Sequence, residues 1–292
     1  MQYVSLSDRL SLSRIVQGFW RLPSWGMDTE ELVEFLNGCL ERGVTTFDSA
    51  EIYGCEQQLG AGLARLRRSD YQIVSKTGIS QTQVNGRVFG YYDTSYERVK
   101  DACKRSIDLL NCEYLDLYLI HREDPLIDHE QTARALLELK SEGLVREIGV
   151  SNFDTYKWNA FNRACGGQLR TNQIEWNPCC YEHFNSGMMD LLCEQKIHPM
   201  IWSPLAGGRL LRDGSPTYAR ARAKLEEIAV RHGVTLSAIV YAWILKHPVG
   251  ALPLVGSHRL DRLDEAIKAL KIELSLVEWF EIYVASGQQQ IR

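Results

Sequence analysis

Short apolar segments alternate with amphipathic segments along almost the whole chain. The segment Y-L-D-L-Y-L-I-H, residues 114–121, is rich in aliphatic and aromatic side chains, which is typical of a buried strand. Between such segments apolar residues recur at helical spacing: within residues 28–42, Leu32 and Leu36 lie one turn apart on the same predicted face. We count eight predicted strands after the first few residues, and helix follows each of them.

This alternation predicts an α/β fold, a single (β/α)8 TIM barrel that occupies residues 1–292 as one domain. Ahead of the first barrel strand, two short apolar runs flank Ser7-Asp8, which predicts a short N-terminal β-hairpin. Beyond the eighth strand, residues 260–270 and 276–286 predict extra C-terminal helices.

A doubly wound sheet is the alternative fold, and it would need a G-x-G-x-x-G turn after its first strand. The nearest match, G-A-G-L-A-R at residues 60–65, lacks the third glycine and falls inside a predicted helix. A nucleotide site of that type is therefore not expected. Residues 77–93, which follow the third predicted strand, show no clear period, and we expect an irregular loop there.

Charge and cysteine usage narrow the possible partners. The formal net charge is −4, which disfavours a nucleic-acid-binding surface. No run of about 18 apolar residues predicts a membrane span, and the first residues lack the apolar core of a signal peptide. We therefore expect a cytoplasmic protein. The eight cysteines form no C-x-x-C pair, so we expect free thiols, and adjacent Cys179 and Cys180 make a poor metal site, so no metal is expected.

Ionisable side chains stand at the ends of three successive predicted strands, where barrel enzymes place their active sites. The second strand ends at Asp48, with Tyr53 in the loop that follows, the third ends at Lys76 and the fourth at His121. Taken singly, each has a structural interpretation: a turn cap, a packed ring, a lysine at the rim, a hydrogen-bonded histidine. Their conjunction in this order favours chemistry instead.

The four residue types together make a proton donor aimed at a carbonyl oxygen. Tyrosine is a poor acid at neutral pH, since its ordinary pKa is about 10, and we expect the Lys76 cation to lower that pKa. Asp48 would orient the ammonium group, and His121 would hydrogen-bond the incoming oxygen. Because none of these side chains can supply electrons, the site also implies a hydride cofactor.

Seven segments give the chain a resemblance to the aldo-keto reductase family over nearly its whole length. In chain order they are F-D-S-A-E-I-Y-G, I-V-S-K-T-G, L-I-H-R, G-V-S-N-F, T-N-Q-I-E-W-N-P, W-S-P-L-A-G-G-R-L and G-S-H-R-L-D-R-L-D-E-A. The resemblance implies that Tyr53 is the acid-base residue and that Asp48, Lys76 and His121 complete a tetrad. It implies reversible reduction of aldehydes or ketones, including aromatic aldehydes or dicarbonyls, with NADPH (NADP+) as the cofactor.

The same resemblance implies a set of cofactor-binding residues. They are Gly18, Trp20, Asp48, Ser151, Asn152, Gln173, Trp202, Ser203, Leu205, Gly207, Arg209, Gly256, Ser257, Arg259, Arg262 and Glu265. Ser151, Asn152 and Gln173 would hold the nicotinamide carboxamide, and Trp202 would stack on the ring, where the family commonly has tyrosine. Ser203 to Arg209 would form a loop over the pyrophosphate, with glycines that allow close backbone approach.

The adenosine end of this set departs from the family pattern. Ser257, Arg259 and Arg262 would bind a 2′-phosphate, and Glu265 would accept from the adenine amino group. The family often has lysine where this chain has Gly256 and asparagine where it has Ala266, so one charge and one amide are missing. We still favour NADPH over NADH.

The substrate side is expected to be an apolar cup. Trp20, Trp25 and His121 are the predicted substrate-binding residues for a small-molecule carbonyl compound. The residues after His121, namely Arg122, Glu123 and Asp124, are expected to fix the loop by ion pairing rather than to bind substrate.

Two function classes remain at this stage. A carbonyl reductase is favoured because the tetrad is complete; the alternative is an NADPH-binding, redox-sensing regulatory subunit with little turnover. Because a barrel encloses its own core, we expect a monomer or a weak homo-oligomer that binds neither nucleic acid nor membrane.

Overall fold

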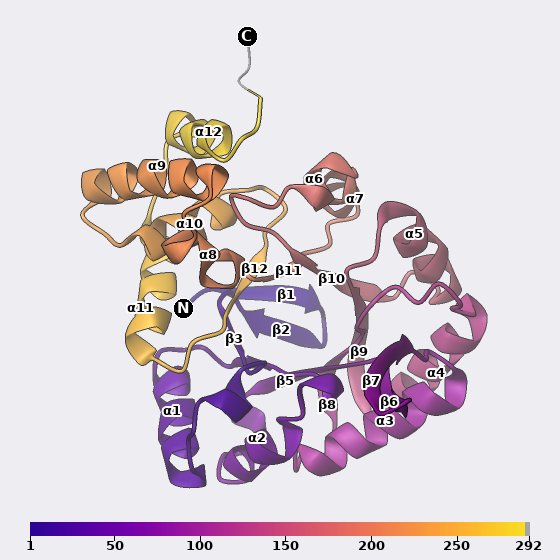
Figure 1. The fold of residues 1–292 in the computed structure, drawn as a ribbon. Coiled ribbons are helices and arrows are strands. Elements are labelled where there is room, and N and C mark those ends of the chain that lie inside the picture. Colours follow the sequence, from indigo (N-terminus) through magenta and orange to yellow (C-terminus); the bar gives the residue numbers. More distant parts are fainter. Residues whose placement is uncertain (290–292) are drawn as a thin grey trace.

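Eight parallel strands close into a barrel in the computed structural model, which describes residues 1–289 (Figure 1). The barrel strands are β3 (Val16–Gly18), β4 (Thr46–Asp48), β5 (Gln72–Thr77), β8 (Leu115–Ile120), β9 (Val145–Ser151), β10 (Leu169–Glu175), β11 (Met200–Trp202) and β12 (Leu252–Val255). Neighbours in the sheet are consecutive barrel strands along the chain, and β12 pairs with β3 to close the ring. The predicted (β/α)8 barrel is confirmed.

Helices surround the barrel, as the ring of coiled ribbons in Figure 1 shows. They are α1 (Thr29–Glu41), α2 (Glu56–Leu63), α3 (Tyr96–Leu109), α4 (His129–Ser141), α5 (Thr155–Ala164), α6 (Glu182–Asn185), α7 (Met188–Glu194), α8 (Arg209–Arg212), α9 (Pro216–His232), α10 (Leu236–Leu245), α11 (Leu260–Lys268) and α12 (Leu276–Ala285). Short 3-10 turns lie at Leu22–Ser24, Glu51–Tyr53, Arg68–Asp70, Ala206–Gly208 and Ala269–Lys271.

Side-chain caps fix where several of these helices begin. The Asp28 side chain accepts from the Glu31 backbone N–H, and the Glu31 side chain accepts in return from the Asp28 N–H, so α1 starts with a complete capping box. Asp128 and Asp154 cap α4 and α5 in the simpler way, through one side-chain acceptor. These acids occur in the sequence just before the amphipathic runs, which is why the helix starts could be predicted from it.

The predicted N-terminal hairpin, β1 (Tyr3–Ser7) and β2 (Leu10–Ser13), lies across one end of the barrel, in the middle of the ring in Figure 1. Leu12 is fully buried and belongs to the same apolar cluster as the inward-facing strand residues. The Ser13 hydroxyl accepts from the Thr46 backbone N–H at 3.1 Å, at the start of β4. The hairpin therefore closes the N-terminal end of the barrel and leaves the opposite end open.

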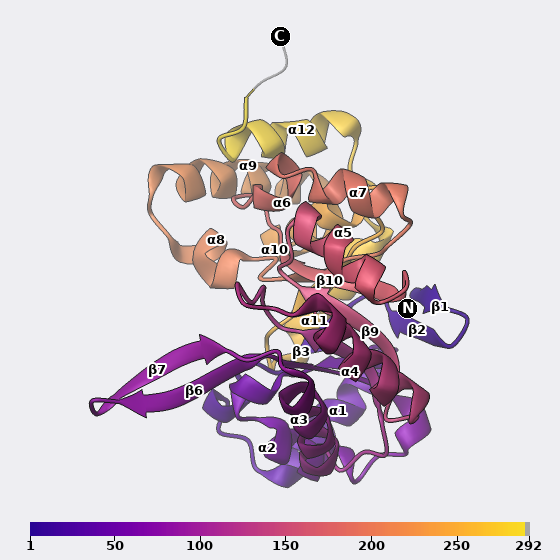
Figure 2. The same cartoon turned by 90° about the vertical axis from the view of Figure 1, so that its right-hand side faces the viewer.

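The expectation of an irregular loop at residues 77–93 is wrong. These residues form the antiparallel strands β6 (Ile79–Val84) and β7 (Arg87–Tyr92), which project away from the barrel (Figure 2). The turn is Asn85-Gly86, with φ of 50° and 75°, the left-handed pair that a two-residue hairpin requires. The Asn-Gly dipeptide was the available signal, but the hairpin is almost wholly exposed, so alternation between apolar and polar positions could not reveal it.

The helical region after β11 divides into α9 and α10 on either side of Gly233. The apolar α10 is buried, and α12 docks on it through Trp243 and Trp279, whose rings stack with centroids 5.0 Å apart. Each of these indole N–H groups donates to the other residue's carbonyl oxygen, at 3.2 and 3.0 Å. Within residues 1–289 no single helix is long and apolar enough to cross a membrane; α9 and α10 meet that length and composition only as a pair bent by 93°.

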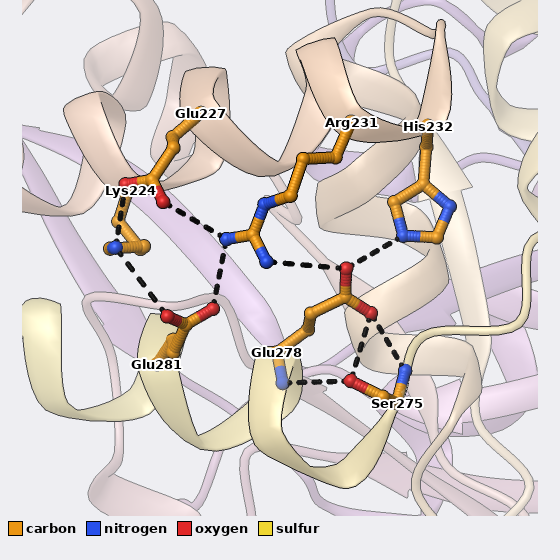
Figure 3. A network of polar contacts seen from close by, with 7 residues as sticks. All are labelled: Lys224, Glu227, Arg231, His232, Ser275, Glu278 and Glu281. Atoms are coloured by element: carbon orange, nitrogen blue, oxygen red, sulfur yellow. Dashed lines mark hydrogen bonds and ion pairs between the residues drawn. The ribbon is translucent and has the colours of Figure 1, made fainter.

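A polar network joins α12 to α9 (Figure 3). Its members are Lys224, Glu227, Arg231, His232, Ser275, Glu278 and Glu281. Arg231 donates to Glu281 at 2.9 Å, and His232 contacts Glu278 at 2.9 Å. Glu278 also completes the capping box at the start of α12, so one side chain both begins the helix and holds it to its neighbour.

Candidate active site

A cavity of about 1080 Å³ opens at the C-terminal ends of the barrel strands. Most of the predicted site residues line it: Gly18, Trp20, Trp25, Asp48, Tyr53, His121, Ser151, Asn152, Gln173, Trp202, Ser203, Leu205, Gly207, Gly256, Ser257, Arg262 and Glu265. These residues come from seven of the eight strand ends or the loops that follow them, and Ile79 and Gln81 represent the loop after β5, as expected for a barrel site. Lys76 does not line the cavity itself. The roles assigned to the site residues remain predictions.

Lys76 forms the buried base of the site. Its side chain is fully buried, and its ammonium lies 2.7 Å from Asp48 Oδ1 and 2.7 Å from the Ser49 carbonyl oxygen. The third neighbour is the Tyr53 hydroxyl, 3.4 Å from Lys76 Nζ. A buried ammonium needs a counter-charge and acceptors, and Asp48, which is 2% exposed, supplies the charge. The three side chains therefore form one connected unit.

The pKa of Tyr53 is raised overall, although Lys76 by itself lowers it as expected. Burial has the largest effect, because it disfavours the phenolate. Lys76 opposes this effect, but the Asp48 carboxylate raises the pKa and so offsets part of the lysine's influence. Tyr53 consequently keeps its proton at neutral pH and can serve as a donor.

His121 is held neutral beside Tyr53. Burial lowers its pKa well below the usual 6.5, and the nearby cations Lys76 and Arg122 lower it further. The imidazole meets the Tyr53 ring edge-on, with centroids 5.6 Å apart. Its buried Nδ1 has no hydrogen-bond partner among the described residues. A neutral imidazole at this position can hydrogen-bond a carbonyl oxygen without adding another charge.

The turn that carries Tyr53 is anchored by Glu51, a residue that the sequence reasoning missed. Arg98, from α3, donates to both Glu51 oxygens, at 2.9 and 2.8 Å. Arg105 pairs with the same carboxylate, and the Thr77 hydroxyl donates to it at 3.1 Å. Gly54, with φ of 66°, ends the turn in the left-handed region. The backbone that positions Tyr53 is thus tied to β5 and α3 at once.

Amide side chains continue the network from Asp48 across the cavity floor. Gln173 Nε2 donates to Asp48 Oδ2 at 2.7 Å, so both carboxylate oxygens are used. Asn152 Nδ2 donates to the Ser151 hydroxyl at 2.7 Å, and its oxygen accepts from the Trp202 indole at 2.9 Å. Fixed amides of this kind suit a planar carboxamide ligand, which needs both donors and acceptors.

The loop after β11 has the backbone that a phosphate cradle needs. Gly207 and Gly208 both have positive φ, 66° and 93°. A Cβ at Gly208 would lie 2.9 Å from an Arg212 guanidinium nitrogen, and Arg21 approaches both Gly207 and Gly256. Arg21 and Arg212 line the cavity, yet sequence reasoning missed both. Neither belongs to a segment with an informative pattern, and only their position across the barrel mouth identifies them.

The arginines predicted for the cofactor are mostly placed elsewhere. Arg209 and Arg259 do not line the cavity; they pair with Asp213 at 3.0 Å and with Asp261 at 3.0 Å on the surface. Arg262 does line it, but donates to Glu265 at 2.9 Å. Local acids within a few residues compete for these guanidinium groups, which the sequence pattern alone did not weigh.

The two tryptophans predicted to bind substrate have different neighbours in the structure. Trp20 faces Tyr53, with ring centroids 6.5 Å apart, and is 60% exposed at the mouth. Trp25 instead packs on Phe19 and on His258, at 5.7 and 5.5 Å, beside the loop that follows β12. Both tryptophans line the cavity, and a substrate contact remains a prediction for each of them.

The residues after His121 behave differently from one another. Glu123 pairs with Lys157 at 2.6 Å, and Asp124 accepts from the Thr94 hydroxyl at 2.8 Å, so these acids fix the loop as expected. Arg122 does not take part: it lines the cavity, with its guanidinium 5.5 Å from the centre of the Trp202 ring.

Comparison with known proteins agrees with this geometry. The model of the Aldo/keto reductase family matches residues 14–283. A 6-dehydroglucose reductase of Agrobacterium fabrum is 38% identical over 99% of both chains, and the oxidoreductase YcsN of Bacillus subtilis is 36% identical over 98% of both. An aldo/keto reductase of Klebsiella pneumoniae, solved with NADP and acetate, superposes with a TM-score of 0.81 at 25% identity, covering 98% of this chain and 95% of its own. The chain therefore belongs to the aldo/keto reductase family of oxidoreductases.

Proposed function

We propose that this protein reduces aldehydes or ketones to alcohols with NADPH and that Tyr53 donates the proton. The observation that carries the proposal is the fully buried Lys76 ammonium, paired with Asp48 and in reach of the Tyr53 hydroxyl. Burying an ammonium group costs free energy, and buried ionisable groups that line or adjoin a cavity are typical of functional sites. It is suited to stabilising the phenolate that remains after proton donation.

The residues present fit a dinucleotide phosphate. Gly207 and Gly208 expose backbone that side chains would otherwise cover, and Arg21 and Arg212 supply guanidinium donors beside it. The Ser151, Asn152 and Gln173 group lies at the other side of the cavity and offers the amides for a nicotinamide. When bound, NADPH supplies a hydride to the carbonyl carbon.

The side chains then account for the proton. His121 donates a hydrogen bond to the carbonyl oxygen and fixes its direction toward Tyr53. As the new C–H bond forms, negative charge develops on that oxygen, and the Tyr53 O–H transfers its proton to it. The resulting phenolate is held beside Lys76 and regains a proton from water. One aldehyde or ketone, one hydride and one proton thus give one alcohol.

The names of relatives support a reductase rather than the regulatory alternative. The Agrobacterium fabrum relative is a 6-dehydroglucose reductase, and a methylglyoxal reductase of Escherichia coli, YeaE, is 29% identical over 94% of this chain. The Klebsiella pneumoniae structure contains NADP. Each acts on or holds a molecule of the class proposed here.

The test is NADPH oxidation with 4-nitrobenzaldehyde and with phenanthrenequinone, in wild type, Tyr53→Phe and Tyr71→Phe. Tyr71 is a buried tyrosine stacked on Phe47 away from the cavity and serves as the matched control. We expect Tyr53→Phe to lower kcat by about 10²–10⁴-fold, with the NADPH Kd, measured by fluorescence, within about threefold of wild type. Tight NADPH binding without turnover in wild type on a broad carbonyl panel would favour the regulatory alternative.

A further inference from the structure

Arg122 is fixed at the catalytic end of the cavity. It follows His121 directly at the end of β8, and its guanidinium lies over the face of the Trp202 indole, 5.5 Å from the ring centre. The indole is itself immobilised, because Trp202 Nε1 donates to Asn152 Oδ1 at 2.9 Å. A cation over an indole face is held by electrostatic attraction. The charge of Arg122 is therefore positioned beside the tetrad rather than free to follow solvent.

The two acids that line the cavity are already paired, Asp48 with Lys76 at 2.7 Å and Glu265 with Arg262 at 2.9 Å. Arg21 approaches the glycine loop after β11, and its guanidinium also lies 5.0 Å from the centre of the Trp20 ring. Within the part of the chain that the structure describes, Arg122 lines the cavity directly after His121 and takes part in no ion pair.

The acids nearest to Arg122 do not neutralise it. Glu123 is taken by Lys157 at 2.6 Å, and Asp124 is bonded to Thr94 at 2.8 Å. The charge of Arg122 lowers the pKa of the Glu175 carboxyl, but burial has the larger effect and raises that pKa. Among residues 1–289, Glu175 and Arg122 form no ion pair. A half-buried guanidinium with unmet donors favours an incoming anion.

We propose that Arg122 binds a carboxylate on the substrate, so that the preferred substrates are carbonyl compounds that carry an acid group. The inference rests on the proposed carbonyl reduction and deepens it by naming the substrate class. One guanidinium matches one carboxylate in charge and in its paired donors. A phosphate would carry about −1.5 to −2 charges, more than the single charge of one guanidinium.

The experiment compares 4-formylbenzoate with its methyl ester, which has nearly the same shape and no charge. The quantity measured is the ratio of kcat/KM for the acid to kcat/KM for the ester, in wild type, Arg122→Met, Arg122→Lys and Arg220→Met. Arg220 is an exposed arginine on α9 outside the cavity and is the matched control. Normalising to the ester removes any general effect of a variant on folding, on Trp202 or on the cofactor.

We expect wild type to prefer the acid and Arg122→Met to lower the ratio by about 10–100-fold, as for loss of a charge-assisted hydrogen bond. Arg122→Lys should retain much of the preference, and Arg220→Met all of it. Direct binding of benzoate, followed by quenching of cavity tryptophan fluorescence, should weaken in Arg122→Met alone.

Three outcomes would overturn the inference. Equal losses for acid and ester in Arg122→Met would show that the arginine only supports Trp202. A weakened NADPH Kd in that variant would assign it to the cofactor. A wild-type enzyme that reduces the ester as well as the acid would have no carboxylate site. Absence of reduction of both compounds and of 4-nitrobenzaldehyde, by contrast, would mark the failure of the proposed function itself.

Discussion

Replacing Asp48 with asparagine should destabilise the protein far more than loss of an ordinary ion pair. Both Asp48 oxygens accept hydrogen bonds, one from Lys76 and one from Gln173, at 2.7 Å each. Asparagine keeps one acceptor oxygen, and its amide N–H₂ would then face another donor. The variant also leaves the fully buried Lys76 ammonium without a counter-charge.

The size of the effect follows from burial. Removing one partner of a buried pair costs about 3–5 kcal/mol. At roughly 2–4 °C for each kcal/mol in a large domain, the expected fall in Tm is roughly 6–20 °C. The control is Glu30→Gln, which removes a pair of similar length, 3.0 Å, whose side chains are 56% and 70% exposed. Exposed pairs contribute about 0–1 kcal/mol, so that variant should lose a few degrees at most.

The assay is thermal unfolding by circular dichroism, supported by urea titration, for both single variants and for Asp48→Asn combined with Lys76→Met. If the buried unpaired charge is the cause, the double variant should be less destabilised than the sum of its two single variants. The folded pKa of Lys76 is raised above 10.5, so the stability it contributes is fully present below pH 10.5 and is lost as pH rises through the folded pKa. Wild type therefore keeps this stability unchanged between pH 7 and pH 9. In Asp48→Asn burial is no longer opposed by the carboxylate and lowers the pKa of Lys76, so the deficit of the variant should be smaller at pH 9 than at pH 7.

Equal, small losses in Asp48→Asn and Glu30→Gln would refute this reasoning, because burial is the main difference between the two pairs. Strict additivity in the double variant would refute it as well, since the two side chains would then act independently.

Three other perturbations test separate parts of the structure. The folded pKa of His121 lies well below 6.5, so below pH 6.5 the unfolded chain binds a proton at this residue and the folded chain does not. The free energy of unfolding should therefore fall by up to about 1.4 kcal/mol per pH unit from this group. A His121→Gln variant whose unfolding free energy, from urea titrations, falls with pH as steeply as that of wild type would count against it. Glu51→Gln removes the carboxylate charge that pairs with Arg98 and should lower kcat about 10–100-fold, because the turn that positions Tyr53 becomes less rigid. Steady-state kinetics that show a matching loss of NADPH affinity would contradict a local effect. Glu278→Gln keeps the cap but loses the ion pair with Arg231, so the loss should be about 0.5–1 kcal/mol at low salt and smaller in 1 M salt. A salt-independent Tm shift would argue against an ionic contribution.

The barrel could be predicted from the sequence because strands and helices alternate with clear periods. The grouping of Asp48, Tyr53 and Lys76 could be predicted because Asp48 and Lys76 lie near strand ends and Tyr53 lies in the loop between those strands. The direction of the Tyr53 pKa shift could not be predicted from the sequence, because it depends on how deeply the ring is buried. The positions of Arg21 and Glu51 in the site could not be predicted either. Arg21 approaches glycines of loops across the barrel mouth, and Glu51 pairs with an arginine of α3.

Pairing with nearby acids explains why some residues predicted to bind the cofactor do not line the cavity. Arg259 has the charge that a phosphate site needs, but its guanidinium is paired with Asp261, two residues away. The chemistry of a residue can be read from its type and spacing, whereas its availability depends on which neighbour reaches it, and that is a property of the folded chain.

The seam between β3 and β12 has a consequence for how the chain is made. Val16 pairs with Leu254, and the Gln17 side chain donates to the Ser257 carbonyl oxygen, so the first barrel strand pairs with the last one. Until β12 leaves the ribosome, the growing sheet has two open edges, and unpaired edges are where nascent chains associate wrongly. The early hairpin covers one end of the barrel but neither edge. Synthesis of this protein therefore passes through a long interval in which most of the barrel exists without being closed.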